Sequence, residues 1–173
     1  KVDTILKRTG TGTITLGQSG DTIDLSNPTS VTLNSTMKNR PAVLVTNSGN
    51  QSIGNASNTL VTFDTETVDT NSAFASNVFT VPSGEGGMYF ISFRGAMQGI
   101  DAGEFIQLRI YLNGSAVDFF ENRMTAYTTD VEFKFSGSGA LNLSAADTIS
   151  YYVYQNSGDS QNLTNAGLYM FKL

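Results

Sequence analysis

Pairs of carboxylates are the side chains of this sequence best suited to chemistry. The local pairs are Asp64 with Glu66, Asp101 with Glu104, Asp118 with Glu121, and Asp130 with Glu132. Two carboxylates held roughly 5 to 9.5 Å apart are sufficient for glycoside hydrolysis, because one acts as acid and the other as base or nucleophile. Each pair fits solvated charge on a loop or strand edge better. We therefore expect no catalytic residues.

The same acidic residues are weak candidates for a calcium site. Calcium prefers oxygen ligands, and the stretch DTETVDTN offers Asp64, Glu66 and Asp69, while GIDAGE offers Asp101 and Glu104. Neither stretch has the ligand spacing of an EF-hand, so surface acids are the simpler interpretation. The sequence predicts no metal site and no cofactor.

Histidine and cysteine are both absent from the sequence. Their absence excludes Ser-His-Asp and Cys-His nucleophile systems, thiolate chemistry and the usual zinc sites. No disulfide can stabilise the fold, so stability must come from core burial or from association with other chains. There is no Trp to stack on sugars, although seven Tyr can partly substitute.

Charge and hydropathy exclude two classes of partner. The net charge of -5 disfavours nucleic-acid binding, which depends on clustered Lys and Arg. No apolar run approaches the roughly 20 residues that span a bilayer, and no signal-peptide pattern is present, so we expect no membrane insertion. An N-terminal segment removed by processing would explain why the chain begins at Lys1 rather than Met.

Short apolar runs separated by Gly, Ser, Thr and Asn indicate an all-β chain and favour a jelly-roll sandwich. After residue 58 the predicted strands are 59–63, 78–81, 88–93, 105–112, 131–135, 140–143, 149–154 and 168–173. In FIQLRIYL, the face from Ile106 to Leu112 is apolar and expected in the core. The face that carries Phe105, Gln107, Arg109 and Tyr111 favours an interface.

Residues 1–58 form a different kind of segment from residues 59–173. Apolar doublets recur in it every eight or nine residues: Ile14 with Leu16, Ile23 with Leu25, and Val31 with Leu33. This repeat is too poor in apolar groups to bury a core alone. Either it adds hairpin strands to the main body, or copies from neighbouring chains wrap into a stem. Residues 47–58 are predicted to be a polar linker or exposed loop.

Aromatic residues recur at set spacings in the first part of the larger segment. The pattern consists of Phe63, Asp69 and Phe74 in FDTETVDTNSAF, then Gly87, Tyr89 and Phe93 in GMYFISF. It resembles the signature of the globular domain of the C1q family, which is related in fold to tumour necrosis factor. Ile91 replaces the family's usual Phe, and the loop before Phe79 is two residues shorter while the loop after it is two residues longer.

Three later stretches agree with this resemblance in their order. YLNGSAV resembles the family's hairpin, where Asn113 and Gly114 suit a type I′ turn. LSAADTISYYVYQNSG resembles a strand entry of the family, with Ala146 where Gly is common. NAGLYMFKL resembles the terminal strand. The resemblance covers residues 63 to 173.

The resemblance implies a ten-stranded jelly roll that assembles as a homotrimer, with aromatic and aliphatic side chains at the three-fold axis. The residues expected at the trimer interface are Tyr89, Phe93, Tyr111, Tyr152, Tyr154, Tyr169 and Phe171. Residues 122–130, NRMTAYTTD, are predicted to form an exposed recognition loop. Its candidate contact residues are Asn122, Arg123, Tyr127 and Asp130.

The N-terminal stretch TGTGTITLGQSGDTIDLS resembles the repeats of bacteriophage fibre, spike and head-decoration proteins. The sequence lacks the collagen stalk and Cys of secreted animal members. It therefore favours a non-enzymatic trimeric virion structural protein at the virion surface. The expected partners are other copies of the chain, capsid or tail proteins bound by the N-terminal segment, and a host-surface receptor or glycan. The alternatives are an extracellular cellular or spore-surface adhesin and a glycan-cleaving phage spike.

Overall fold

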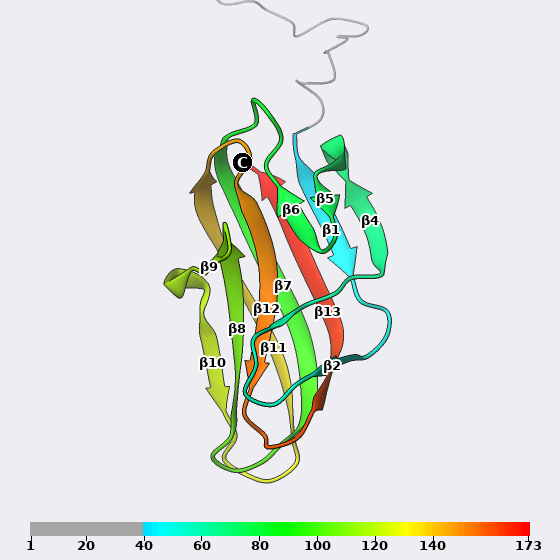
Figure 1. The fold of residues 1–173 in the computed structure, drawn as a ribbon, viewed down its shortest axis with the longest axis vertical. Coiled ribbons are helices and arrows are strands. Elements are labelled where there is room, and N and C mark those ends of the chain that lie inside the picture. The colour runs from blue at the N-terminus through cyan, green and yellow to red at the C-terminus, as the bar shows by residue number, and fades with distance from the viewer. Residues whose placement is uncertain (1–39) are drawn as a thin grey trace, which may run out of the picture. The chain divides into compact units, whose positions relative to one another are not determined.

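Two antiparallel sheets pack face to face in residues 40–173, the part of the chain that this computed structural model describes (Figure 1). The first sheet contains, in spatial order, β11 (Val131–Leu143), β7 (Gly87–Ile100), β13 (Gln161–Lys172), β1 (Ala42–Thr46) and β4 (Thr65–Asp69), with β2 (Gln51–Ile53) paired to β13. The second contains β10 (Asn122–Thr125), β8 (Phe105–Leu112), β12 (Thr148–Gln155), β6 (Val78–Thr80) and β5 (Phe74–Ala75), with β3 (Thr59–Leu60) on β12 and β9 (Ser115–Ala116) on β8. This architecture confirms the predicted all-β jelly-roll sandwich.

The helical content of the described residues is limited to two 3-10 turns, η1 (Thr70–Ser72) and η2 (Asp118–Phe120). Neither turn is long enough to cross a membrane.

The core lies between the sheets and is built from alternate residues of the long strands. Ile106, Leu108 and Ile110 of β8 are fully buried, as predicted. On β12, Tyr151 packs its ring 5.2 Å from that of Phe93 on β7. The Tyr151 hydroxyl is buried without a hydrogen-bond partner in the described structure, and this burial raises its pKa well above the ordinary value of a tyrosine.

Two strands that precede residue 59 belong to the first sheet. β1 lies between β13 and β4 and buries Val43 and Val45, while β2 pairs with β13 and buries Ile53. The stretch 47–58, predicted as a polar linker, therefore contains a sheet strand. The sandwich starts earlier in the sequence than the predicted head, because alternate apolar residues in AVLVT are sufficient for a central strand. The predicted apolar doublets lie outside the described residues.

Two predicted strands, 131–135 and 140–143, are a single strand, β11, which pairs with β7 along its length. The intervening glycines make room for aromatic rings. A Cβ at Gly137 would lie 2.4 Å from Cζ of Phe93, and one at Gly139 would lie 2.8 Å from Cε1 of Phe119. These glycines are therefore packing positions within a strand and not a turn.

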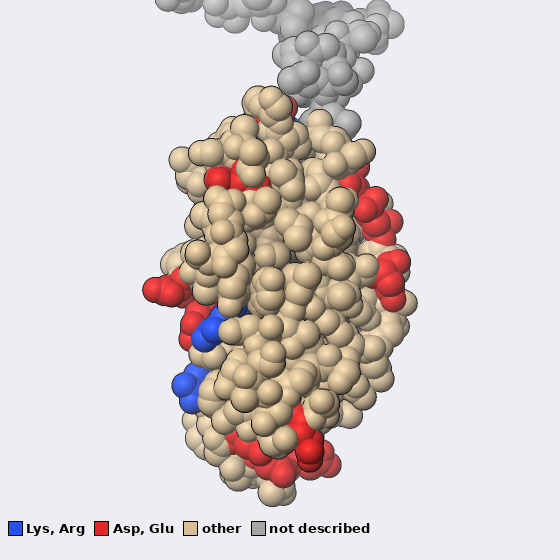
Figure 2. Space-filling model, viewed as in Figure 1, with Lys and Arg blue, Asp and Glu red and all other residues tan. Residues whose placement is uncertain are grey.

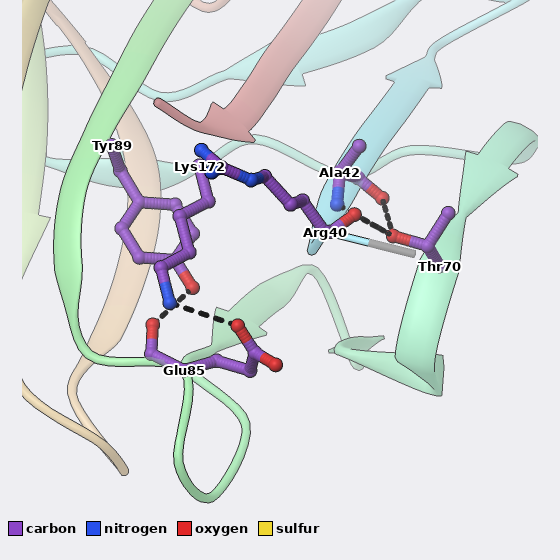
Figure 3. A network of polar contacts seen from close by, with 6 residues as sticks. All are labelled: Arg40, Ala42, Thr70, Glu85, Tyr89 and Lys172. Atoms are coloured by element: carbon purple, nitrogen blue, oxygen red, sulfur yellow. Dashed lines mark hydrogen bonds and ion pairs between the residues drawn. The ribbon is translucent and has the colours of Figure 1, made fainter. Parts of the chain in front are cut away.

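The turn between β6 and β7 is fastened to the end of β13 (Figure 3). Nζ of Lys172 lies 2.9 Å from Oε2 of Glu85, and both side chains are largely buried, with 19% and 14% exposure. The Tyr89 hydroxyl donates to the Glu85 carbonyl at 2.7 Å. Burial, followed by the Glu85 charge, raises the pKa of Tyr89 to about 12. Gly87 has a φ of 141°, and a Cβ there would lie 3.2 Å from Cε of Lys172.

The two predicted turns of the C-terminal half differ in their backbone strain. Asn113 and Gly114 have φ values of 51° and 79°, which agrees with the predicted type I′ hairpin between β8 and β9. Ala146, which stands where the C1q family commonly has Gly, has a φ of 70°. An alanine in this left-handed conformation is strained by about 1 kcal/mol or more.

We expect Ala146→Gly to stabilise the protein by roughly 0.5–1 kcal/mol, because relief of the strain outweighs the extra chain entropy of glycine. The measurement is urea unfolding at fixed protein concentration. Ala145→Gly is the matched control, since Ala145 has no positive φ, and it should not stabilise the protein. Equal stability changes in the two variants would contradict the interpretation of strain at Ala146.

Candidate functional site

The outer face of the first sheet presents apolar side chains across neighbouring strands. Strand pairing sets Phe171 opposite both Ala42 and Phe90, and sets Leu44 opposite both Tyr169 and Val68. Inward-facing neighbours of these residues, such as Val43 and Met170, are buried in the core. We call the surface formed by Ala42, Leu44, Val68, Met88, Phe90, Tyr169 and Phe171 the apolar face.

Several side chains of the apolar face are exposed to an extent unusual for large hydrophobic groups. Met88 is 45% exposed, Phe171 44% and Val68 37%. The rings of Phe90 and Phe171 contact each other, with centroids 5.3 Å apart, and Phe90 is partly exposed. Contiguous exposed apolar surface of this kind marks an interaction site.

The outer face of the second sheet is of a different kind, because its aromatic rings are interleaved with arginines. We call it the aromatic-arginine face, formed by Phe105, Arg109, Tyr111, Arg123, Tyr152 and Tyr154. The Tyr111 and Tyr152 centroids are 4.2 Å apart, and the Phe105 and Tyr154 rings stack at 5.6 Å. The Arg123 guanidinium lies 3.6 Å from the Phe105 centroid. Figure 2 shows the cationic atoms of this view gathered near β8 and β10.

Polar partners fix Arg109 on the aromatic-arginine face. Its guanidinium donates to Oε1 of Gln107 at 2.9 Å and to Oδ1 of Asn58 at 3.2 Å. Nε of Arg109 lies 3.4 Å from Oε2 of Glu121 but forms no hydrogen bond, so this ion pair is held by charge and not by aligned donors. Arg109 is thus held in place by polar groups of its own protomer.

The seven residues predicted for the trimer interface do not share a surface. Tyr89 and Phe93 have 0% and 1% exposure inside the sandwich, so they cannot contact another chain. Of the remaining residues, three lie on the aromatic-arginine face, namely Tyr111, Tyr152 and Tyr154. The other two, Tyr169 and Phe171, lie on the apolar face. The predicted interface did not include Met88 and Phe90, the outward-facing residues of β7. They alternate with Tyr89 and Ile91, so alternation alone did not show which of the two sets faces outward.

The predicted recognition loop is only partly a loop. Asn122 and Arg123 lie in β10, which pairs with β8, whereas Tyr127 follows the strand and is 92% exposed. The backbone N–H of Asp130 donates to Oδ1 of Asp101 at 2.7 Å, which connects this stretch to the turn after β7. Figure 2 shows acidic atoms at the bottom of the view, where Figure 1 places the loops that follow β7 and β10.

One of the predicted acid pairs lines a cavity, but both of its carboxylates are exposed. Asp64 and Glu66 border a cavity of about 350 Å³ together with the Phe63 and Phe74 rings. The Ser48 hydroxyl and N–H both donate to the Asp64 carboxylate and lower its pKa. A lowered pKa keeps Asp64 ionised, which suits a base or nucleophile, but a glycosidase also needs an acid whose pKa burial has raised, and Glu66 is exposed.

The three calcium candidates are not assembled into one site. Asp69 accepts hydrogen bonds from the backbone N–H groups of Ala73 and Phe74, at 2.8 and 3.1 Å, and Asp64 is engaged by Ser48. Within residues 40–173, no three acidic side chains are placed to share a metal ion.

The remaining acid pairs are also engaged in local contacts. Glu104 accepts a hydrogen bond from the backbone N–H of Asp101 at 2.7 Å, and Glu132 lies 3.5 Å from the Lys134 ammonium. Glu121 accepts from the Gln107 amide and faces Arg109. These contacts explain the acids as surface and turn residues.

Comparison with known proteins identifies the fold. No protein-family model matches the sequence, and no curated protein matches it either. Among solved structures, the globular domain of zebrafish complement 1qA protein is similar, with a TM-score of 0.59 over 78% of this chain and 98% of that chain. The fold is C1q-like. The sequence identity of 19% means that the similarity concerns the fold, which agrees with the motif resemblance from Phe63 onward.

Proposed function

We propose that this chain is a non-enzymatic structural protein that forms a homotrimer and displays its C1q-like head at the surface of a bacteriophage virion. The observation that carries the proposal is the apolar face, with Met88, Phe171 and Val68 exposed on three strands of one sheet. Without disulfides, burial of this surface against other copies would add stability as well as assemble the head.

A closed ring of three chains requires two different surfaces on each protomer, because its contacts are heterologous. The apolar face supplies one surface. The second is the edge beside η2, where the Phe119 ring is 74% exposed and packs on the Phe120 ring at 5.3 Å. We infer that the Phe119 edge of one protomer docks on the apolar face of the next.

The aromatic-arginine face is then left free to bind a partner. Tyr and Arg are enriched among the residues that dominate binding energy at interfaces. Tyr127, which follows β10 and is 92% exposed, would extend the same recognition surface. Three copies on one trimer would strengthen weak contacts with a host receptor or glycan through avidity.

The virion location rests on the sequence of the N-terminal segment. Its Thr/Gly-rich stretch TGTGTITLGQSGDTIDLS resembles repeats of bacteriophage fibre, spike and decoration proteins. This segment would attach the head to capsid or tail proteins. A cellular or spore-surface adhesin is the alternative with the same head, and the exposure of both Asp64 and Glu66 disfavours the glycan-cleaving spike.

A binding assay tests the attachment role. We expect the full chain to co-sediment with virus particles that lack the gene for this protein, and a version starting at Arg40 to stay in solution, because only the full chain carries the attachment segment. Binding of both versions, or of neither, would contradict attachment by that segment. Co-sedimentation of the full chain with bacterial cells or spores but not with particles would favour the adhesin.

A further inference from the structure

A cavity of about 320 Å³ opens on the outer face of the first sheet, beyond the apolar face along the strands. Its volume is at the lower end of the range for small-molecule sites, about 300–1,000 Å³. Its lining comes from β7, β11 and β13 and consists of Arg94, Gly95, Ala96, Lys134, Phe135, Ser136 and Asn165. None of these lining residues belongs to the apolar face or to the predicted recognition loop.

A bulge in β13 shapes one wall of the cavity. Thr164 pairs with Ala96 and Gly167 pairs with Arg94, so β13 has one more residue than β7 between these two pairs. Asn165 occupies the bulge with a φ of 52°, a left-handed conformation that asparagine tolerates better than most residues. Bulges re-aim side chains and are common beside binding sites. Here the bulge brings the Asn165 amide to the cavity.

The cavity gathers positive charge in an acidic protein. Of the 10 Lys and Arg residues in the chain, four precede residue 40, and two of the remaining six line this cavity with no Asp or Glu among its lining residues. Arg94 forms no ion pair within the described residues, and its guanidinium lies 5.7 Å from the Tyr169 centroid. Lys134 contacts Glu132 at 3.5 Å, but both side chains are exposed and such a pair contributes little.

We propose that this cavity binds a small oxyanion, such as a sulfate, a phosphate or the carboxylate of an acidic sugar. The anion would lie between the Arg94 guanidinium and the Lys134 ammonium, with Asn165 and Ser136 as further hydrogen-bond donors. Charge-assisted hydrogen bonds of this kind are roughly twice as strong as neutral ones. All these residues come from one chain, so the inference does not rest on the trimer.

Titration calorimetry of the full chain at low salt tests this site. The probes are sodium sulfate, sodium phosphate and sodium glucuronate, with glucose as the uncharged comparison. We expect saturable binding of at least one anion and none of glucose. Arg94→Gln and Lys134→Gln should each weaken binding roughly ten-fold or more, because each removes a charged hydrogen-bond donor. Asn165→Gly keeps the left-handed backbone and should weaken binding by a smaller factor.

Arg40→Gln is the matched control, since Arg40 is an exposed cation that does not line the cavity. Circular dichroism of each variant verifies folding. Glucuronate bound more tightly than sulfate and phosphate would identify an acidic sugar as the natural source of the anion, and the reverse order an inorganic anion. No saturable anion binding, or an equal loss in Arg40→Gln, would overturn the site. Light scattering on the same samples separates this test from the trimer, since monomers that bind the anion would support the site alone.

Discussion

Phe171→Glu is expected to dissociate the protein into single folded chains of 18.5 kDa. In one protomer the Phe171 ring is 44% exposed at the surface of the first sheet, so a carboxylate there remains hydrated and the sandwich tolerates it. In the proposed trimer the same carboxylate would be buried against the next chain at each of three contacts. An unpaired buried charge costs at least several kcal/mol, so the trimer should weaken by several orders of magnitude. Sedimentation velocity measures the change.

Tyr152→Glu is the matched control for this prediction. Tyr152 is an aromatic residue on the outer face of the opposite sheet, where its ring contacts the ring of Tyr111. We expect this variant to remain trimeric, although its binding to a host receptor should weaken. If Tyr152→Glu dissociated the protein and Phe171→Glu did not, the aromatic-arginine face would be the interface between chains and the apolar face would need another partner.

Lys172→Met should destabilise the protein by about 3 kcal/mol, since loss of one partner leaves the other charge of a buried pair uncompensated. The Lys172 ammonium is the ion-pair partner of Glu85, whose side chain is only 14% exposed (Figure 3). The pair also fixes the turn before β7 to the end of β13, so the loss extends to the Tyr89 hydrogen bond with the Glu85 carbonyl. Guanidinium unfolding at fixed protein concentration measures the change.

The double variant Glu85→Gln with Lys172→Met tests the mechanism. Removal of both charges leaves no unpaired buried ion, so most of the lost stability should return. A double variant as unstable as Lys172→Met would show that packing of the lysine stem, and not its charge, stabilises the turn.

Local alternation was sufficient to predict much of the sandwich. The sequence FIQLRIYL correctly places Ile106, Leu108 and Ile110 in the core, and the same alternation in ISYYVY agrees with the burial of Tyr151. These strands could be predicted because only one of their two faces is fully apolar. The type I′ turn at Asn113 and Gly114 was predictable because so few residue pairs suit it.

Where both faces of a strand are apolar, alternation does not indicate which one faces the core. In GMYFISF, Tyr89 and Phe93 were predicted to face a neighbouring chain, but Met88 and Phe90 occupy the outward positions. The choice depends on which set fits between the sheets. Gly137 on β11 decides it for Phe93, since a larger residue there would collide with the inward ring.

The cationic cavity was beyond prediction from the sequence for a related reason. Arg94 and Lys134 are 40 positions apart. They come together through the pairing of β7 with β11. The third wall depends on a bulge at Asn165, and no local pattern in QNLTNAGLYMFK signals the extra residue. The two arginine-bearing surfaces of the molecule therefore become distinguishable only in three dimensions.

The solution mass of the intact chain, measured by multi-angle light scattering over a range of concentrations, tests the central claim most directly. One chain has a mass of 18.5 kDa. The proposed assembly predicts three times that mass, unchanged on dilution through the micromolar range. A mass of one chain at all concentrations would contradict the trimer and leave the apolar face without its proposed partner.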